Sequence, residues 1–428
     1  MKCVLAFYGT RGDVEPGIAL GRELRRRQHD VYMAVPPDLI GFAEAAGLNA
    51  VAYGPDNQAW LASTRNLWAR VFRNFWRVGE IRRLLREARE PGLLAWAEMS
   101  RSLTSLTEGA DLVVTGMSYQ ELALNVADFH GIPLATVLWF PNRVNGHLLP
   151  NLPASVIRSV MKVYERLVWL GVKKCEDAQR RELGLPKSSR PAPSRLAARQ
   201  ALEIQAYDDV CFPGLRAEWA RWGGQRPFVG TLTLESATEA DDEVMAWIEA
   251  GTPPIFFGFG SIPVESPTDT VTLIAAACAQ LGHRALVGAG WSEFTGVPAM
   301  DNVKVVGAVN FASIFPACRA VVHHGGAGTT AAGLRAGVPT LVLWMADVQA
   351  MWGAAVKRLE IGTSRRFSAT TEESLVADLR TILAPAYRER ARDIASLMTR
   401  PAASVAAAAD LVERFACAPY GSEHHVRR

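Results

Sequence analysis

The residues with the clearest chemical meaning lie in one glycine-rich segment in the second half of the chain. Residues 323–330 read His-His-Gly-Gly-Ala-Gly-Thr-Thr and follow the apolar run Ala320–Val322. Glycines let the backbone approach a ligand closely, and a helix that begins here points its unpaired N–H groups at an anion. A histidine at the end of the strand can donate to a phosphate oxygen and offset charge on a leaving group. The segment therefore predicts a diphosphate-binding loop, with a glycine turn beside a buried, hydrogen-bonded histidine as the alternative.

The same segment also fits the dinucleotide-binding pattern G-x-G-x-x-A. Gly326, Gly328 and Ala331 match it, and Asp347 follows where a ribose-binding acid is expected. Such patterns usually occupy the first strand–helix turn of their domain, whereas four strands are expected before this one. An NAD-dependent oxidoreductase is therefore kept only as a distant alternative.

These residues must be positioned by strands and helices, and the sequence predicts an α/β fold. Continuous apolar runs alternate with amphipathic stretches, as in parallel sheets covered by helices on both faces. The runs predict strands at Cys3–Tyr8, Asp30–Val35, Asp111–Thr115, Pro133–Leu138, Pro254–Gly260, Arg284–Gly288, Val303–Gly307, Ala320–His323 and Pro339–Leu343. A helix is expected at Pro16–Gln28. Two such series, each opening with a strand that runs into glycine, predict two doubly wound domains.

The expected domain boundaries follow changes in composition. Gly223–Pro227 and the acidic, aperiodic segment Glu235–Glu243 indicate a linker. We therefore expect an N-terminal domain over 1–223, a linker over 224–242 and a C-terminal domain over 243–400. An alanine-rich helix over 401–416 can dock back on the N-terminal domain, and 417–428 reads as a tail.

Length and composition exclude several classes of protein. The chain has 428 residues, 49% of them hydrophobic and 21% charged, which is the mix of a globular protein of two or three domains. Its net charge of +3 is too near neutral for a nucleic-acid-binding chain. No apolar run reaches the 18 or so residues that span a bilayer. The six cysteines show no CxxC spacing, so we expect no disulfide framework or thiolate metal site, and a cytoplasmic location.

One stretch has an unusual charge. Trp60–Arg89 holds eight arginines and two glutamates, a local charge of about +6, with tryptophans and phenylalanines interleaved. Such a segment can rest on an anionic membrane surface or hold a bulky amphipathic ligand. The alternative is a solvated helix whose aromatic residues pack on their own domain. Peripheral contact through residues 60–89 with the inner face of the plasma membrane is thus one expectation.

As a set, the motifs resemble the nucleotide-sugar glycosyltransferases of GT-B fold. The segment from His324 to Thr329, the triplet Gly337–Pro339 and the segment Trp344–Gln349 resemble their nucleotide-sugar signature. The loops Gly9–Pro16 and Phe257–Ser261 are similar as well. The nearest branch is the one that glycosylates glycopeptide antibiotics, sterols and mycobacterial glycopeptidolipids, and the resemblance extends from residue 2 to about 410. It implies two Rossmann-like domains that face across a crevice, with the acceptor bound mainly in the first and the nucleotide sugar mainly in the second.

The resemblance implies roles for residues of the second domain. The counterpart of His324 contacts the diphosphate in this family, and the backbone after it completes the phosphate site. Ser261 matches a serine near the phosphates, while Trp291 and Val309 fall where the family holds the nucleobase, although both also suit ordinary core packing. The implied donor-binding residues are Ser261, Trp291, Val309, His324, Gly326, Gly328, Thr329, Asp347 and Gln349.

One departure from the family pattern concerns the donor sugar. The family commonly carries Asp-Gln in this loop to hold sugar hydroxyls. Here Gln349 keeps its place, but Val348 occupies the aspartate position and Asp347 comes one residue early. Either Asp347 substitutes through a shifted loop, or the contact is lost, which would suit a deoxysugar.

Asp13 is the expected catalytic base. Direct displacement at an anomeric carbon passes through an oxocarbenium-like state and needs a base near the acceptor hydroxyl. Many family members place a histidine at this position. The antibiotic and sterol branch has an aspartate there instead, and this sequence has Asp13. Asp13 can also cap a helix that starts near Pro16, and the two roles are compatible. With an ordinary pKa near 3.9, it would orient the nucleophile and accept the proton late.

Four residues are expected to bind the acceptor. Arg11 can meet a polar or acidic group, although a solvated loop arginine is equally plausible. Trp139, Phe140 and Asn142 follow an expected strand, at the edge where open α/β sheets bind ligands. No carboxylate cluster has metal-ligand spacing, so we expect neither a metal nor a cofactor beyond the nucleoside-diphosphate sugar as co-substrate.

The sequence thus predicts an inverting hexosyltransferase of natural-product or cell-envelope biosynthesis. It would move a deoxyhexose, dTDP-linked, to a hydroxyl of a hydrophobic or lipid-linked acceptor such as a glycopeptidolipid or similar lipopeptide. A UDP-glucose-dependent sterol or small-molecule glucosyltransferase is the alternative. A binding module that kept the fold and lost transfer is a further alternative from another class, supported only by Val348.

Overall fold

The computed structural model describes residues 1–57, 89–148, 152–260, 266–290, 300–345 and 347–418. The chain forms two compact units, each built on a six-stranded parallel sheet. The first unit comprises 1–206, 215–232 and the chain from Val405 onward, and the second comprises 207–214 and 233–404. Each unit therefore includes a segment that is remote from the rest of it in sequence.

The sheet of the first unit has the strand order β3-β2-β1-β4-β5-β6. Its strands are β1 (Lys2–Ala6), β2 (Asp30–Val35), β3 (Asn49–Ala52), β4 (Leu112–Thr115), β5 (Leu134–Leu138) and β6 (Glu203–Gln205). The central strand β1 pairs on one side with β2, Lys2 opposite Asp30, and on the other side with β4, Cys3 opposite Leu112. All described residues of β4 and β5 are buried, which explains their continuous apolar sequence.

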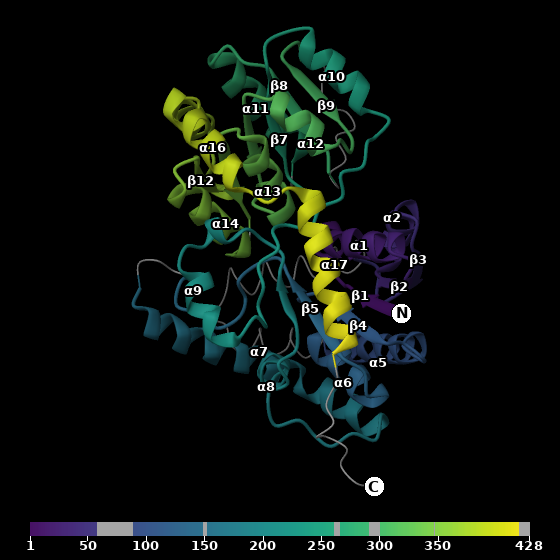
Figure 1. The fold of residues 1–428 in the computed structure, drawn as a ribbon. Helices are drawn as coiled ribbons and strands as arrows, with labels where there is room; N and C mark the ends of the chain where they lie inside the picture. Colours follow the sequence, from purple (N-terminus) through teal and green to yellow (C-terminus); the bar gives the residue numbers. More distant parts are fainter. Residues whose placement is uncertain (58–88, 149–151, 261–265, 291–299, 346, 419–428) are drawn as a thin grey trace. The chain divides into compact units, whose positions relative to one another are not determined.

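Helices cover both faces of this sheet (Figure 1). They are α1 (Arg11–Arg26), α2 (Ile40–Ala45), α5 (Arg89–Leu106), α6 (Gln120–His130), α7 (Ala154–Glu182), α8 (Ala192–Ala198), α9 (Leu215–Trp219) and the C-terminal helix α17 (Pro401–Cys417). Ion pairs join the end of α1 to α17, since the Arg27 guanidinium lies 2.6 Å from Asp410 and 2.7 Å from Glu413. The last helix of the chain is in this way attached to the first.

The second sheet has the order β12-β11-β10-β7-β8-β9. Its strands are β7 (Ile255–Gly258), β8 (Ala285–Gly288), β9 (Val303–Val306), β10 (Ala320–His323), β11 (Thr340–Trp344) and β12 (Gly362–Arg366). Its helices are α10 (Asp241–Glu249), α11 (Pro267–Gln280), α12 (Phe311–Ile314), α13 (Ala327–Ala336), α14 (Asp347–Arg358), α15 (Glu372–Ile382) and α16 (Pro385–Leu397). Successive residues of β7 point to opposite faces, so Phe256 and Phe257 belong to two separate hydrophobic cores.

The predicted fold class is confirmed, since both sheets are parallel, with helices over their faces. All nine predicted strands are present to within two residues at each end, and β3, β6 and β12 are additional. The prediction that the first helix starts near Pro16 is wrong, because α1 begins at Arg11 and contains Pro16. The sequence misled because proline removes one hydrogen bond from a helix interior and therefore favours a start.

Candidate active site

The loops that contain Asp13 and His324 each follow the carboxyl end of a central strand of their sheet. When each sheet is numbered from its own first strand, its order is 3-2-1-4-5-6, so strands 1 and 4 are neighbours. Chain connections leave strands 1 and 4 in opposite directions across the sheet, and ligands of open α/β sheets bind beyond the carboxyl ends of these two strands. Asp13 follows strand β1 of the first unit, and His324 follows strand β10 of the second.

Asp13 closes the first turn of α1. The backbone N–H of Thr10 donates to Oδ2 of Asp13 at 2.7 Å, and the Thr10 hydroxyl donates to the same oxygen at 3.0 Å. Gly9 has φ +135°, and a Cβ atom added there would lie 2.4 Å from Oδ2. Glycine is thus required where the carboxylate lies against the backbone. Asp13 caps its helix, as expected, but from within the first turn.

The environment of Asp13 favours its protonated form more than the sequence indicated. Burial raises the pKa of Asp13 to about 6, while the hydrogen bonds from Thr10 act in the opposite direction. The expectation of an ordinary pKa near 3.9 is therefore wrong, because the sequence does not reveal how much water reaches the carboxylate. A carboxylate with a pKa close to 6 is a better match for general-base work near neutral pH.

The four expected acceptor-binding residues lie in different environments. Arg11 is exposed, and its guanidinium lies 4.5 Å from the centroid of the Phe42 ring and 3.7 Å from Glu15. Trp139 and Phe140 are almost fully buried. Asn142 has a buried Oδ1 with no hydrogen-bond partner among the described residues. Of the four, Asn142 has the unsatisfied acceptor that a bound hydroxyl would complete.

Trp139 nevertheless reaches the region between strands β1 and β4. A Cβ atom added to Gly116, which follows β4, would lie 3.0 Å from both Trp139 and Phe7. Phe7 itself follows β1. Gly116 therefore lets the two aromatic rings approach each other at this end of the sheet.

Several residues near Asp13 were missed in the sequence. The rings of Tyr8 and Tyr119 meet edge to face with centroids 5.2 Å apart. Tyr119 has φ +56°, a conformation that L-residues rarely adopt and that often marks functional sites. Asn57 donates from Nδ2 to the Gly9 carbonyl at 2.5 Å, and this hydrogen bond holds the backbone of the loop that precedes Asp13. Their common signal is position, since Tyr8 and Tyr119 each follow a central strand closely.

In the second unit, His323 shapes the glycine-rich loop. Its side chain is fully buried, and its Nδ1 accepts a hydrogen bond from the Gly325 N–H at 2.9 Å. Burial lowers the pKa of His323 to about 3, so the ring is neutral and the proton resides on Nε2. His323 is thus a buried, hydrogen-bonded histidine, the alternative that the sequence left open, and it sits beside the loop histidine His324.

His324 lies between two glycines. Cβ atoms added to Gly260 and Gly326 would lie 2.4 and 2.6 Å from its ring. Burial lowers the pKa of His324 to about 4, although the Gly258 backbone acts in the opposite direction, and its Nδ1 has no partner among the described residues. The ring is therefore neutral at pH 7, with a nitrogen that remains available. It lies between the ends of strands β7 and β10, the position at which such sheets bind ligands.

Helix α13 begins without a side-chain cap. Its N-cap residue is Gly326, and its first intrahelical bond runs from the Thr330 N–H to the Gly326 carbonyl at 2.9 Å. The N–H groups of Ala327, Gly328 and Thr329 precede that bond and have no intrahelical acceptor. A Cβ atom added to Gly328 would come no closer than 3.9 Å to another atom, Cγ2 of Thr233. Open space at a helix N-terminus is suited to an anion.

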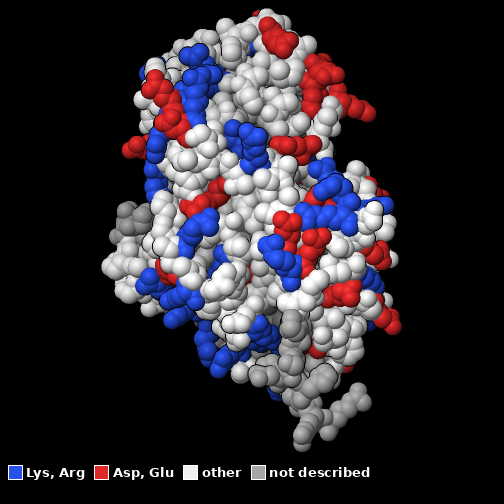
Figure 2. Space-filling model, in the orientation of Figure 1, with Lys and Arg blue, Asp and Glu red and all other residues white. Residues whose placement is uncertain are grey.

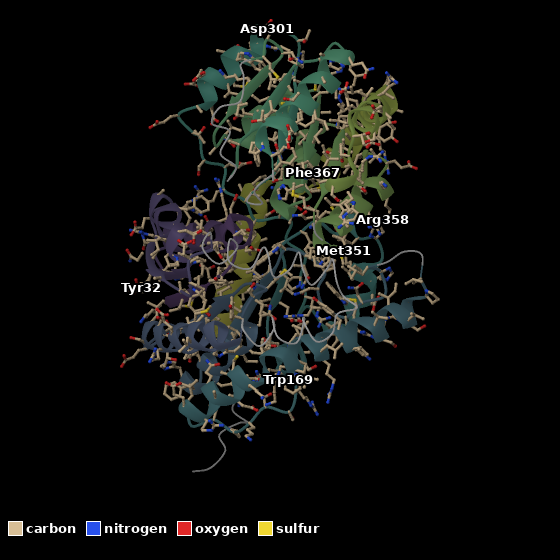
Figure 3. The ribbon with its side chains drawn as sticks, turned by 180° about the vertical axis from the view of Figure 1, so that it is seen from behind. Tyr32, Trp169, Asp301, Met351, Arg358 and Phe367 are labelled. Atoms are coloured by element: carbon tan, nitrogen blue, oxygen red, sulfur yellow. The ribbon has the colours of Figure 1, made fainter. Side chains whose placement is uncertain are left out.

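The remaining predicted donor residues are only partly described. Gln349 accepts a hydrogen bond at Oε1 from the Met345 N–H at 2.8 Å, and its backbone lies against Gly325 of the glycine loop. Val348 is 45% exposed at the start of α14, on which Figure 3 labels Met351 and Arg358. Val309 is half-buried against one of the cores. Ser261 and Trp291 lie outside the described residues, as does the side chain of Asp347.

Within the described ranges, no three His, Cys, Asp or Glu side chains are grouped so that they could hold a metal ion. In the same part of the chain, no helix combines the length and apolar character needed to cross a membrane. All six cysteines are free. The basic stretch at 60–89 lies almost wholly outside the described residues.

Two family models match the chain. Residues 3–95 match the glycosyltransferase family 28 N-terminal domain, and residues 273–413 match the C-terminal domain described as erythromycin biosynthesis protein CIII-like. These segments contain the loops of Asp13 and His324, respectively. Among solved structures, the glycosyltransferase of kitacinnamycin has a TM-score of 0.69 at 19% identity and covers 97% of this chain and 98% of its own. The glycosyltransferase VinC in complex with dTDP has a TM-score of 0.64 at 17% identity, over 97% of this chain and 99% of its own. The fold is therefore GT-B.

Closer relatives define the family. An uncharacterized glycosyltransferase of Mycobacterium tuberculosis is 59% identical over 96% of this chain and 98% of its own length. A similar protein of Mycobacterium leprae is 57% identical over 96% of both chains. A sterol 3-beta-glucosyltransferase of Arabidopsis thaliana is 28% identical, over 97% of this chain and 68% of its own. The chain belongs to this glycosyltransferase family, as its motifs indicated. The comparisons give the oxidoreductase alternative no support.

Proposed function

We propose that this glycosyltransferase transfers a deoxyhexose from a dTDP-sugar to a hydroxyl of a lipopeptide-like natural product, with inversion at the anomeric carbon. The observation that carries the proposal is the pair of sites beyond the central strands. One holds a carboxylate with a raised pKa, and the other holds an uncapped helix N-terminus beside a neutral histidine. A base and an anion site are what this displacement requires.

Asp13 is proposed to act on the acceptor. Both hydrogen bonds from Thr10 end on Oδ2, and within the described residues Oδ1 receives none. Oδ1 would therefore accept the proton of the acceptor hydroxyl as its oxygen bonds to the anomeric carbon. Asn142, with its unsatisfied Oδ1, would orient a polar group of the same acceptor. The aromatic rings of Tyr8, Tyr119 and Trp139 would provide apolar surface for a hydrophobic acceptor.

The glycine loop is proposed to take the departing diphosphate. As the bond between the anomeric carbon and the phosphate oxygen breaks, negative charge develops on the diphosphate. The N–H groups at the start of α13 point toward such charge, and the helix dipole favours it. A neutral His324 can donate one hydrogen bond without being protonated. Stabilisation of the leaving group would therefore need no metal ion.

The choice of donor rests on Val348. An exposed valine at the position of the family's aspartate offers no hydrogen bond to a sugar hydroxyl, which suits a deoxysugar. The dTDP-bound VinC shares the fold, and this supports a thymidine nucleotide. A UDP-glucose-dependent sterol glucosyltransferase is the second candidate, because the Arabidopsis thaliana relative is named a sterol 3-beta-glucosyltransferase.

A thermal-shift panel of dTDP, UDP, GDP and NAD(H) tests the donor site. A ligand that binds only the folded state raises the melting temperature, since it adds RT ln(1 + [L]/Kd) to stability. We expect a shift with dTDP that is lost in His324→Ala. A shift with UDP alone would favour the glucosyltransferase alternative, and a shift with NAD(H) alone would overturn the proposal.

Transfer assays test the sugar and the acceptor. We expect turnover of dTDP-rhamnose with a lipopeptide acceptor, and a product whose anomeric configuration is inverted by NMR. Because its side chain is exposed, Val348→Asp should fold normally and gain activity with hydroxyl-rich donors relative to deoxy donors. Equal donor preference in both proteins would remove the role given to Val348.

A further inference from the structure

Helix α7 has a second apolar face that the described residues of its own unit leave exposed. Ordinary surface helices bury one apolar stripe and expose a polar one. In α7, Ile157 and Trp169 are buried, and the Trp169 indole donates to Glu176 at 2.7 Å. Seven further apolar residues of this helix are between 45 and 69% exposed. We call them the α7 stripe: Val156, Val160, Val163, Tyr164, Leu167, Val168 and Leu170.

The charge beside this stripe is strongly positive. Residues 154–174 contain five basic residues and one acidic residue, Glu165. Glu165 is half-buried and accepts a hydrogen bond from Ser194 at 3.4 Å. Among the described residues, Lys162, Arg166 and Lys174 make no ion pair. Figure 2 shows Lys and Arg side chains gathered along the lower left edge, where α7 runs in Figure 1.

The apolar stripe and the positive charge beside it together indicate what binds to this face of α7. An apolar stripe flanked by unpaired cations binds at the boundary between lipid headgroups and acyl chains, where the helix lies in the plane of the membrane. The stripe spans 15 residues, about 22 Å of helix, which is long enough to lie along a bilayer surface. A symmetric pairing of two copies through the stripe would instead place like charges against each other.

We propose that the α7 stripe binds the surface of an anionic lipid bilayer. The apolar side chains would enter the headgroup region, while Lys162, Arg166 and Lys174 pair with lipid phosphates. The α7 stripe includes no residue of the Asp13 or His324 loops, so the inference does not depend on the proposed function. It also differs from the peripheral contact that the sequence suggested for residues 60–89, because it rests entirely on described residues.

Co-sedimentation of the full chain with lipid vesicles tests the proposal. One vesicle type contains about 30% phosphatidylglycerol in phosphatidylcholine, and the other contains phosphatidylcholine alone. Each basic residue near an anionic surface contributes about fivefold in binding. The double variant Lys162→Glu, Arg166→Glu should therefore bind the anionic vesicles about 25-fold more weakly or worse. Val163→Glu, Leu167→Glu should also lose binding, because charged groups resist entry into the headgroup boundary.

Matched controls come from the second unit. Leu397 is 63% exposed on α16, and Arg380 is exposed on α15. Leu397→Glu and Arg380→Glu should bind the anionic vesicles as the wild-type protein does. All variants should keep the melting temperature of the wild-type protein, which shows that they are folded.

The expected result is binding to anionic vesicles that falls with added salt and is lost only in the α7 variants. Three results would overturn the proposal. They are no binding to anionic vesicles, binding that survives both α7 double variants, and a wild-type dimer in solution that the α7 variants convert to monomer. The second would place the membrane contact elsewhere in the chain, and the third would make a second copy the occupant.

Discussion

The two units use the same strand order to build opposite kinds of helix N-terminus. In α1, the carboxylate of Asp13 occupies the first turn and accepts both donors of Thr10. In α13, the N-cap is Gly326 and no side chain fills that place. One terminus carries its own anion, whereas the other leaves its N–H groups for an anion from outside.

Asp13 and His324 also differ in the direction in which burial shifts their pKa values. Burial raises the pKa of Asp13 to about 6 and lowers the pKa of His324 to about 4. In both cases the neutral form is favoured, because both groups lie in loops that exclude water. Under the proposed function, Asp13 would serve as the base and His324 as a neutral hydrogen-bond donor. The shared strand order supplies two such positions, one after the first strand and one after the fourth, and a few loop residues decide what each position does.

The largest expected effect is that of Asp13→Asn. If Asp13 is the base, removing its ability to accept a proton should lower kcat by about 10³-fold, within the range typical of general-base catalysis. The thermal shift with dTDP should be unchanged, because the proposed nucleotide site lies in the other unit. Glu15→Gln on the same helix serves as the control and should retain activity. Full activity of Asp13→Asn would reduce Asp13 to a helix cap.

His324→Ala should have the next largest effect. The loss of one donor to the leaving group should lower kcat by about 10²-fold and weaken dTDP binding. His324→Gln retains a hydrogen-bond donor and should recover part of the activity. His283→Ala, a half-buried histidine on the same unit, is the control for loss of an imidazole. An unchanged dTDP affinity in His324→Ala would mean that the nucleotide site lies elsewhere.

A matched pair of glycines separates the two helix termini directly. Gly12 and Gly328 are each the second residue of their helix, and a Cβ atom at either would meet no atom closer than 3.9 Å. Gly328→Ala should fold normally but weaken dTDP binding about tenfold, because its methyl group enters the space next to the open N–H groups. Gly12→Ala should leave dTDP binding unchanged. Calorimetric titration of both variants measures the difference, and equal affinities would contradict an anion site at α13.

Whether a strand could be predicted from the sequence depends on the interactions that stabilise it. Strands with continuous apolar runs were all predicted. Strand β6 was missed because its Glu203 is fully buried, which only its ion pairs with Arg143 and Arg226 make possible. The edge strand β12 was missed because it is polar, and Arg365 pairs with Asp378 at 2.6 Å. These partners lie far away in sequence, so no local pattern reveals them.

Some residues of the candidate site can be recognised in the sequence, and others can be recognised only in the structure. The glycine loop and Asp13 stand out in the sequence because their spacing carries the chemistry. Tyr119 does not, because its left-handed backbone is set by its position between strand β4 and helix α6. Asn57 likewise becomes relevant only because the fold brings it to the Gly9 carbonyl. The pKa shift of Asp13 also arises from tertiary burial, which composition and motifs do not encode.

The smallest expected effect is on stability, and it has opposite signs in the two units. Burial raises the pKa of Asp13 above its unfolded value of about 3.9, so its contribution to stability is lost as pH rises from about 4 through 6. The pKa of His324 is lowered from about 6.5, so its contribution is lost as pH falls from 6.5 toward 4. Each effect should be on the order of 1 kcal/mol across this window. Relative to the wild type, Asp13→Asn should therefore gain stability as pH rises across this window, and His324→Gln should gain it as pH falls. Urea unfolding at pH 4.5 and 7 measures both differences, and slopes of the same sign would mean that the two loops do not differ as their residues indicate.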